Sequence, residues 1–415
     1  MGGVSMEWKE VRLGDIADVQ TGPFGSQLHK SDYIAEGIPC IMPTNIGPHL
    51  NFIVDGIAHV SEVDANRLSR HLTEIGDIIY ARRGDIEKCA YVTTNEEKWL
   101  CGTGCLKIRC NNEVNSRFIA YLLSTAECKK WITGNAVGTT MLNLSKGILS
   151  NLPLLVPSHE DQRRIASILS SLDRKIELNN KINADLEEMA QAIFKNWFVD
   201  FEPFKDGKFV DSELGMIPEE WKVGRADDFY QINIGKTPPR KEHKWFSTNP
   251  ADKIWVSIAN MGNSGIFISD SSEYLTKEAV DRHNIIMVPR NTILLSFKLT
   301  VGRVAIADKE LTTNEAIARF ILSDDKYMEY LYLYLKNFDY NSLGSTSSIA
   351  TAVNSKTIKG MQMLQPSDKI IDAFHIQVNP IFEKIRSLTK ENSRLSLLRD
   401  TLLPRLMSGE LEVPE

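Results

Sequence analysis

The chain has 415 residues, of which 42% are hydrophobic and 25% charged, and its formal net charge is −6. This length exceeds one ordinary hydrophobic core and predicts two or three domains, with the composition of a soluble globular protein. No apolar run approaches the roughly 20 residues that cross a bilayer, and the first residues lack the features of a secretory signal, so we expect a cytoplasmic location. The acidic balance argues against a polybasic protein that coats nucleic acid, although a local basic cleft remains compatible with it.

All six cysteines fall in the first half of the chain. Cys101, Cys105 and Cys110 form the densest group, but neither a paired C-x-x-C nor a neighbouring pair of histidines accompanies them. This spacing gives only weak support to a zinc site. Reduced thiols packed inside a domain are the simpler interpretation, and we expect no metal.

The most informative feature is an internal repeat. Residues 8–22 match 221–235 without a gap, and both stretches open with Trp-Lys and end with Gly. Further along, residues 76–92 lie over 291–307, and residues 151–158 lie over 360–367. Because the three blocks keep their order while their spacing drifts, the sequence indicates a duplicated unit whose loops differ in length.

In chain order, each copy combines short strands with a helix. Residues 77–80 and 152–156 predict strands around a helix at 117–131. The second copy repeats the first of these strands at 292–295 and the helix at 327–338. The mixture predicts an α+β fold for each half.

The sequence pattern changes after each copy. Residues 160–196 contain neither proline nor glycine, and their apolar side chains recur at heptad spacing. The second stretch, 367–404, carries the same frame and is interrupted only by Pro380, which predicts a kink or a helix start. The predicted coiled-coil core is Ile165, Ile168, Leu172, Ile182, Leu186, Met189, Ile193, Phe374, Ile381, Leu388, Leu395, Leu398 and Leu402.

Each long helix, at 1.5 Å per residue, would be about 50 Å long. One heptad stripe per half predicts that the two helices pair, and an antiparallel pair is expected because the chain must return. The alternative is that each helix lies along its own domain. The polar position Asn179 corresponds to Leu388 in the other helix, and Ile182 corresponds to Glu391. This mismatch would help to fix one register.

The repeat predicts the domain boundaries. We expect a first globular domain at 1–157, a long helix at 158–197, a linker at 198–220, a second globular domain at 221–366, and a second long helix with a tail at 367–415. Both helices are followed by segments that would head towards the opposite domain.

The parts that common catalytic chemistries require are missing from the sequence. It contains no phosphate-binding G-x-x-x-x-G-K-[ST] loop, no H-E-x-x-H and no G-x-S-x-G. The fragment 237–240, Thr-Pro-Pro-Arg, differs from the [DNS]-P-P-[YF] of adenine-N6 methyltransferases at both informative positions. A scaffold without catalytic residues is favoured over an enzyme.

Basic side chains occupy two repeat-equivalent places in the two halves. The first is the early loop, which follows Gly22 in the first half and Gly235 in the second, and the other place follows the strand near residue 80 or 295. Arg and Lys at such places suit contacts with DNA bases and phosphates, whereas solvated surface charge is the alternative for any one of them. The candidate DNA-binding residues are His29, Lys30, Arg82, Arg83, Lys88, Lys236, Arg240, Lys241, Lys244, Lys298 and Arg303.

Two similar domains on a stiff rod would act as a ruler on DNA. A rod of about 50 Å spans on the order of 15 base pairs, which would allow the domains to sit on successive turns of one duplex face. Divergence between the halves would make the two target sites different in sequence.

At this point the layout resembles the DNA specificity subunit of type I restriction–modification systems, and the resemblance covers essentially the whole chain. Its marks are W-K-x-V-x-L-G-D-I at 8–16, L-P-L-L-V-P at 152–157 and E-D-Q-R-R-I at 160–165. A segment at 187–204 that contains F-K-N-W-F-V-D-F-E-P-F, and L-L-P-R-L-M-S-G-E-L at 402–411, complete the set.

The resemblance implies two target recognition domains that read a split, asymmetric DNA sequence, with the helices as conserved spacers. It implies a non-catalytic subunit that binds double-stranded DNA and assembles with two methyltransferase subunits and with restriction subunits. S-adenosylmethionine, ATP and magnesium would belong to those partners, and this chain itself would bind no cofactor.

The second domain departs from the family pattern because it opens W-K-V-G-R-A-D-D-F, so its first strand or loop is expected to be altered. Two other functions remain open from the residues alone. One is a coiled-coil scaffold that bridges two protein partners without touching DNA, and the other is a free-standing enzyme.

Overall fold

A computed structural model describes residues 7–138, 142–343 and 353–413. The chain divides into two compact units. Unit 1 contains residues 1–177 together with 392–415, and unit 2 contains residues 178–391. Both dividing points lie inside long helices, whereas the predicted domain boundaries fall where those helices begin.

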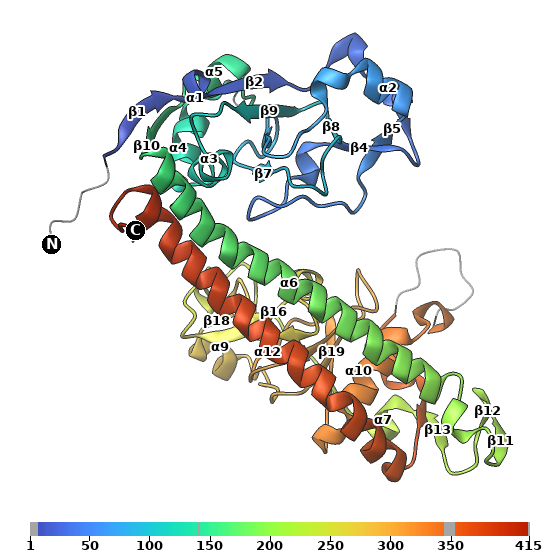
Figure 1. The fold of residues 1–415 in the computed structure, drawn as a ribbon. Coiled ribbons are helices and arrows are strands. Elements are labelled where there is room, and N and C mark those ends of the chain that lie inside the picture. The colour runs from blue at the N-terminus through green and yellow to red at the C-terminus, as the bar shows by residue number, and fades with distance from the viewer. Residues whose placement is uncertain (1–6, 139–141, 344–352, 414–415) are drawn as a thin grey trace. The chain divides into compact units, whose positions relative to one another are not determined.

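Unit 1 contains two four-stranded sheets (Figure 1). We call the sheet whose strands contain more residues in total the larger sheet. All its pairs are antiparallel, in the order β2 (Ala17–Thr21), β9 (Cys105–Cys110), β6 (Ile78–Ala81) and β7 (Cys89–Tyr91). The predicted strand at 77–80 is β6, and its four side chains are all buried. The smaller sheet has the order β3 (Tyr33–Ile34), β5 (Ala58–Val60), β4 (Ile38–Ile41) and β8 (Leu100–Cys101), and α2 (Glu62–Arg67) follows β5 in the chain.

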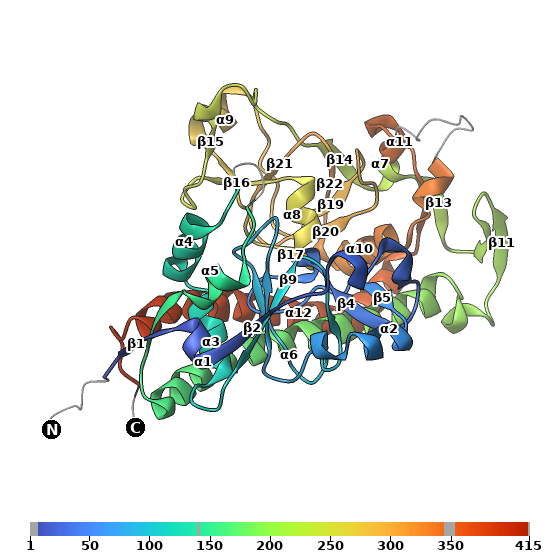
Figure 2. The same ribbon diagram turned by 90° about the horizontal axis from the view of Figure 1, so that it is seen from above.

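Unit 2 repeats this plan with one additional strand. Its larger sheet has the order β14 (Gln231–Ile234), β22 (Ile317–Ile321), β19 (Ile293–Ser296), β20 (Val304–Ala307) and β17 (Phe267–Ile268). Its smaller sheet has the order β15 (Phe246–Ser247), β18 (Tyr274–Leu275), β16 (Lys253–Val256) and β21 (Thr312–Thr313), with α8 (Ile258–Asn263) and α9 (Lys277–Arg282) in its connections. The helix α10 (Met328–Asn337) contacts β19 and β20 (Figure 2).

A two-stranded ladder joins the start and the end of each domain. β1 (Lys9–Arg12) pairs with β10 (Pro153–Val156), and β13 (Lys222–Arg225) pairs with β23 (Gln362–Gln365). A four-residue helix follows each first strand, α1 (Leu13–Ile16) in unit 1 and α7 (Ala226–Phe229) in unit 2.

The departure at the start of the second domain does not alter these elements, so that expectation is wrong. Gly224 stands where the first domain has Val11, and Phe229 stands where it has Ile16. A Cβ atom on Gly224 would come within 2.9 Å of the Phe229 ring. The glycine therefore makes room for the larger aromatic side chain.

The helix predicted at 117–131 is two helices, α3 (Ser116–Leu123) and α4 (Ala126–Asn135). Thr125 separates them, because its hydroxyl accepts a hydrogen bond from the Cys128 amide and caps α4. Single short helices precede the last strand of each domain, α5 (Lys146–Ser150) and α11 (Ser355–Lys359).

The predicted linker at 198–220 is structured. It contains a hairpin of β11 (Phe209–Ser212) and β12 (Gly215–Pro218). Phe201 and Phe204 contact Trp221 with ring centroids 5.5 and 5.1 Å apart. In unit 1, Leu411 from the C-terminal tail packs against the core that includes Trp8. The segment after the first long helix therefore packs on the second domain, and the tail after the second long helix packs on the first domain, as predicted.

Two 40-residue helices, α6 (His159–Phe198) and α12 (Asp368–Met407), each continue from one unit into the other. In unit 1, Ile165 and Leu169 of α6 share a core with Leu406 and Met407 of α12. In unit 2, Phe194 and Phe198 contact Phe374. The beginning of each helix therefore packs beside the end of the other, which is the antiparallel pairing that the heptad frame predicts. No helix among the described residues is long and apolar enough to span a membrane.

Burial along the helices follows the heptad frame only in part. Ile165, Phe374 and Leu388 are buried, and most of the other predicted core residues are half-buried, namely Ile168, Leu172, Ile182, Leu186, Ile193, Ile381, Leu395 and Leu402. Met189 and Leu398 are 53% and 47% exposed, so their assignment to the core is wrong. Their neighbours Ala190 and Arg399 are buried instead, because each helix also packs against the sheet domain of its unit.

Pro380 lies inside α12, which begins at Asp368, so a helix start near Pro380 is wrong. A kink there stays a prediction. In unit 2, the Asn179 amide donates a hydrogen bond of 2.9 Å to the Glu391 carboxylate. The two polar exceptions to the apolar frame thus contact each other across the helix pair, which supports their role in fixing the register.

The two units use different chemistry at one repeated position of the helix pair. In unit 1, the buried Arg399 guanidinium lies 3.1 Å from the Asp173 carboxylate, which also accepts a hydrogen bond from the Tyr121 hydroxyl. At the equivalent positions unit 2 has Ala190 and Phe382, both fully buried. An ion pair and an apolar pair therefore occupy the same place in the repeat.

We expect Arg399→Ala to destabilise the protein by about 3 kcal/mol, because it leaves the Asp173 carboxylate without its buried cation. Adding Asp173→Phe reproduces the apolar pair of unit 2 and should recover most of this loss. The measurement is the denaturation midpoint of the three proteins. Arg405→Ala, which removes an exposed pair with Glu410, is the control and should cost under about 1 kcal/mol. A double variant that is less stable than Arg399→Ala contradicts this account.

Candidate nucleic-acid interface

Three loops meet at one edge of the larger sheet in each unit, and we call this region the three-loop edge. In unit 1 it comprises residues 22–25 after β2, 82–86 after β6 and 102–104 after β8. In unit 2 it comprises residues 235–240 after β14, 297–302 after β19 and 314–316 after β21. The Arg82 amide donates to the Gly104 carbonyl at 2.7 Å, and the Phe297 amide donates to the Ala316 carbonyl at 3.0 Å. The same backbone frame thus holds both edges.

A glycine is required where the first loop of each edge approaches the third. A Cβ atom on Gly22 would lie 2.1 Å from the carbonyl oxygen of Gly102. A Cβ atom on Gly235 would lie 1.9 Å from the carbonyl oxygen of Asn314. Only glycine permits this close approach of two backbones, which explains why the first repeat block ends on glycine in both copies.

The edge of unit 1 is basic and aromatic. Phe24 is 58% exposed, and the Arg82 guanidinium lies 5.8 Å from the centre of its ring. Burial, and then the charge of the neighbouring Arg83, lowers the pKa of Arg82 from its ordinary value. Arg83 is exposed, and the Thr103 hydroxyl donates a hydrogen bond of 2.7 Å to the Pro23 carbonyl. The edge of unit 1 therefore combines two adjacent arginines with an aromatic ring beside Arg82, a combination that suits nucleic-acid contacts.

The edge of unit 2 has both signs of charge. The Thr237 hydroxyl donates a hydrogen bond to the Glu315 carboxylate. Burial acts to raise the pKa of Glu315, but this hydrogen bond and the charges of Lys298 and Arg240 lower it overall, so the carboxylate is ionised. Glu315, in the loop after β21, thus links that loop to the early loop, and it offers an acceptor whose ionised form two nearby cations favour.

The remaining basic candidates of the early loop in unit 2 lie near the smaller sheet. The Arg240 guanidinium stacks 4.2 Å from the Phe246 ring centre and 4.5 Å from that of Trp255, and it donates to Glu273 at 2.6 Å. Lys244 lies over the Trp245 ring at 4.3 Å. Lys236 donates to the His283 carbonyl at 2.6 Å, and Lys241 is exposed. Aromatic rings therefore hold two of these four cations in place.

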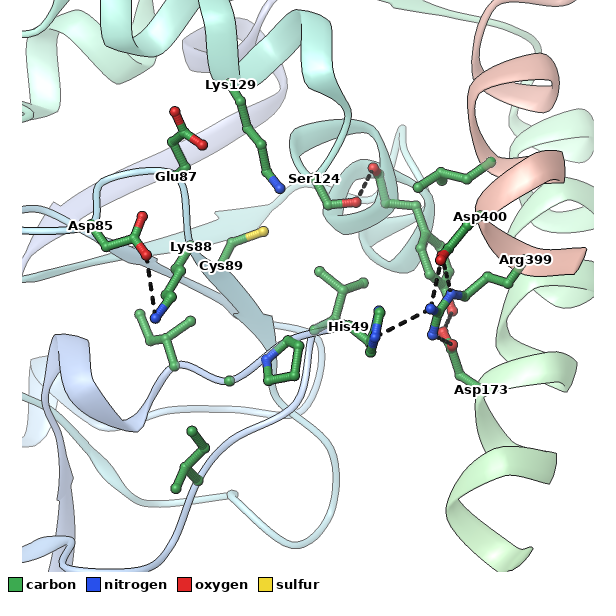
Figure 3. A pocket seen from close by; sticks show the side chains of 17 residues that line it. His49, Asp85, Glu87, Lys88, Cys89, Ser124, Lys129, Asp173, Arg399 and Asp400 are labelled. Atoms are coloured by element: carbon green, nitrogen blue, oxygen red, sulfur yellow. Dashed lines mark hydrogen bonds and ion pairs between the residues drawn. The ribbon is translucent and has the colours of Figure 1, made fainter. Parts of the chain in front are cut away.

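Two further candidates, Arg303 and Lys88, also have partners in their own unit. Arg303 donates to the Ile258 carbonyl at 2.8 Å, so its guanidinium anchors the hairpin between β19 and β20 to α8. Lys88 lies 3.3 Å from Asp85 and lines a cavity of about 540 Å³ in unit 1 (Figure 3). In unit 1, His29 and Lys30 are exposed and lead into β3 of the smaller sheet. Whether any of these four contacts DNA stays a prediction.

The cavity beside Lys88 contains charges that neutralise one another. Arg399 lies between Asp173 and Asp400 at 3.1 and 2.8 Å, and it faces the His49 ring at 3.3 Å (Figure 3). Burial, and then the charge of Arg399, lowers the pKa of His49, which favours a neutral imidazole. No cluster of three or more potential metal-ligating side chains occurs among the described residues. This arrangement suits a structural role.

The sequence did not point to Phe24, Thr103, Thr237 or Glu315 as members of the edges. Phe24 and Thr237 lie in the early loops that the repeat marked, so aligning those loops could have found them. Thr103 and Glu315 precede the repeat-equivalent strands β9 and β22, but no recognisable sequence block marks them. Only the fold brings them next to the basic residues.

Comparison with known proteins shows the family to which this chain belongs. The family model for the type I restriction modification DNA specificity domain matches residues 6–188 and 218–375, so the chain belongs to that family. The "Type I restriction enzyme HindI specificity subunit" of Haemophilus influenzae is 29% identical, with 98% of this chain and 100% of the relative covered. The "Type I restriction enzyme MjaIX specificity subunit" of Methanocaldococcus jannaschii is also 29% identical, with 100% and 96% covered.

A solved structure shares the fold. The type I restriction–modification system S subunit from M. genitalium superposes with a TM-score of 0.60 at 15% sequence identity, and 97% of each chain is covered. The duplicated α+β domains and the paired long helices are therefore the architecture of this family.

We expect Lys298→Ala to act on duplex DNA binding and Arg303→Ala to act on stability. Lys298 is exposed, so its loss should weaken binding, reduce the salt dependence of log K by about one counterion and leave thermal stability unchanged. Arg303→Ala should lower stability by about 1 kcal/mol, because the Ile258 carbonyl loses its donor. Binding titrations at several salt concentrations and thermal melts would check both. Equal salt slopes for Lys298→Ala and the unmodified protein contradict the phosphate contact.

Proposed function

We propose that this chain is the non-catalytic DNA sequence-specificity subunit of a type I restriction–modification complex, and that its two units read the two parts of a split, asymmetric sequence. The observation that carries the proposal is the pair of three-loop edges, which share one backbone frame and differ in their exposed side chains. The names of the relatives support the same conclusion, since they are specificity subunits.

The chemistry of the edges predicts different targets. In unit 1, Arg83 is exposed and follows Arg82, whose guanidinium lies over the Phe24 ring, and arginine recognises guanine through two acceptors in the major groove. In unit 2, the Glu315 carboxylate can accept from the amino group of cytosine, while Lys298 and Arg240 supply positive charge for phosphates. Two edges with different donors and acceptors would read two different half-sites.

Partner subunits would supply the chemistry. Two methyltransferase subunits would bring S-adenosylmethionine for adenine methylation, and restriction subunits would bring ATP and magnesium for cleavage. The long helices offer a surface for such partners, because several of their large apolar side chains are exposed, namely Leu178, Met189, Ile376, Leu397 and Leu398. Where such side chains form a contiguous patch, they mark a protein contact site.

The same exposed side chains would serve the second candidate, a scaffold that bridges two protein partners without reading DNA. The two candidates differ in what the three-loop edges do. A reader requires that changes at one edge alter sequence preference, whereas a scaffold leaves preference untouched.

We expect single changes at the two edges to relax different halves of one recognition sequence. With the methyltransferase subunits co-expressed, Arg83→Gln should relax positions in one half-site only, and Glu315→Gln should relax positions in the other only, by about 1–3 kcal/mol per base. Genome-wide mapping of N6-methyladenine in each strain measures this. The control is Lys222→Gln, on an exposed position of β13 outside either edge. Identical motifs in all strains would favour the scaffold.

A further inference from the structure

The hairpin between β19 and β20 in unit 2 carries a leucine whose environment is unfavourable in the free chain. Leu299 is fully exposed, and its backbone is in the left-handed region at φ +62°. A left-handed conformation costs a non-glycine residue roughly 1–2 kcal/mol. Exposure adds the loss of the leucine's hydrophobic stabilisation.

The repeat shows that the fold does not require this leucine. The strands β6 and β19 align residue for residue, and the position of Leu299 in unit 1 is occupied by Gly84, also left-handed at φ +76°. Glycine adopts this conformation without a steric penalty. Unit 1 thus uses the residue that the turn favours, while unit 2 places a large apolar side chain at the same turn.

The hairpin holds the backbone on both sides of Leu299 in place. The Ser296 hydroxyl donates to the Thr300 carbonyl at 2.6 Å, and the Gly302 amide donates to the Ser296 carbonyl at 3.0 Å. The Arg303 amide donates to the Ser296 hydroxyl at 3.0 Å, and the Arg303 guanidinium anchors the hairpin to α8. A tip tied at its base by three hydrogen bonds presents Leu299 as a rigid projection.

The neighbours of Leu299 indicate what the projection meets. Lys298 precedes it, and the three-loop edge of unit 2 also contains Arg240 and the ionised Glu315. An apolar side chain beside cations suits a surface of phosphates and stacked bases. Leucine is among the apolar side chains that proteins insert between base steps, where they unstack the bases and kink the duplex.

We propose that Leu299 is a wedge that inserts at a base step of the half-site read by unit 2 and partly unstacks it, while the hairpin tip of unit 1, which ends in Gly84, does not. This inference rests on the proposed function. Part of the specificity at that step would come from how easily the step deforms, since pyrimidine–purine steps unstack most readily.

The test uses the complete complex with the methyltransferase subunits and a duplex that carries its mapped recognition sequence. 2-Aminopurine replaces successive purines of each half-site, leaving out the methylated adenines, and its fluorescence rises when the base unstacks. We expect a rise at one step of the unit 2 half-site with the unmodified chain. Leu299→Gly should abolish the rise and weaken specific binding about tenfold, with an unchanged salt slope and no loss of thermal stability.

Lys298→Ala is the matched variant one residue away, and it should keep the fluorescence rise while reducing the salt slope. If Leu299→Gly leaves both the fluorescence and the affinity unchanged, the wedge is wrong. If Leu299→Gly instead releases the methyltransferase subunits and leaves DNA binding by the assembled complex intact, the leucine contacts a protein and the wedge is also wrong. A complex that shows no sequence-specific binding with the unmodified chain would reject the proposed function itself.

Discussion

The antiparallel packing of α6 and α12 is the constraint on which the rest of the molecule depends. Each unit contains the beginning of one helix and the end of the other, so neither core is complete with one helix alone. Phe198, at the end of α6, contacts Trp221 at the start of the second domain with ring centroids 5.6 Å apart. Leu406, near the end of α12, belongs to the core of unit 1. The helix pair therefore stabilises both domains as well as linking them.

The repeat separates what the fold requires from what recognition would use. At the helix pair, an ion pair between Asp173 and Arg399 and an apolar pair of Phe382 and Ala190 fill the same place, because either satisfies a buried position when both partners are present. At the loop edges, the backbone bonds recur while the side chains differ. A conserved frame with divergent exposed loops is the expected result when two copies keep one architecture and acquire different targets.

Much of this architecture could be predicted from the sequence, because periodic patterns report directly on burial. The repeat, the strands around residues 80 and 295, and both long helices were predicted. The break at Thr125 was missed, since one capping hydroxyl outweighs an apolar pattern that continues across it. The heptad frame misplaced Met189, because α6 packs on α10 as well as on α12 and so turns Ala190 inwards in its place. The contact of Thr237 with Glu315 could not be predicted, since only tertiary structure brings those loops together.

Lengthening the helix pair tests the central claim of the proposal most directly. One heptad would be inserted after Glu177 in α6 and one after Glu391 in α12, at the points where each helix passes from one unit to the other. A heptad adds about 10 Å of helix, which corresponds to about three base pairs. Mapping of N6-methyladenine with co-expressed methyltransferase subunits should show the same two half-sites, separated by a spacer up to about three base pairs longer. Altered half-sites with an unchanged spacer would contradict the account.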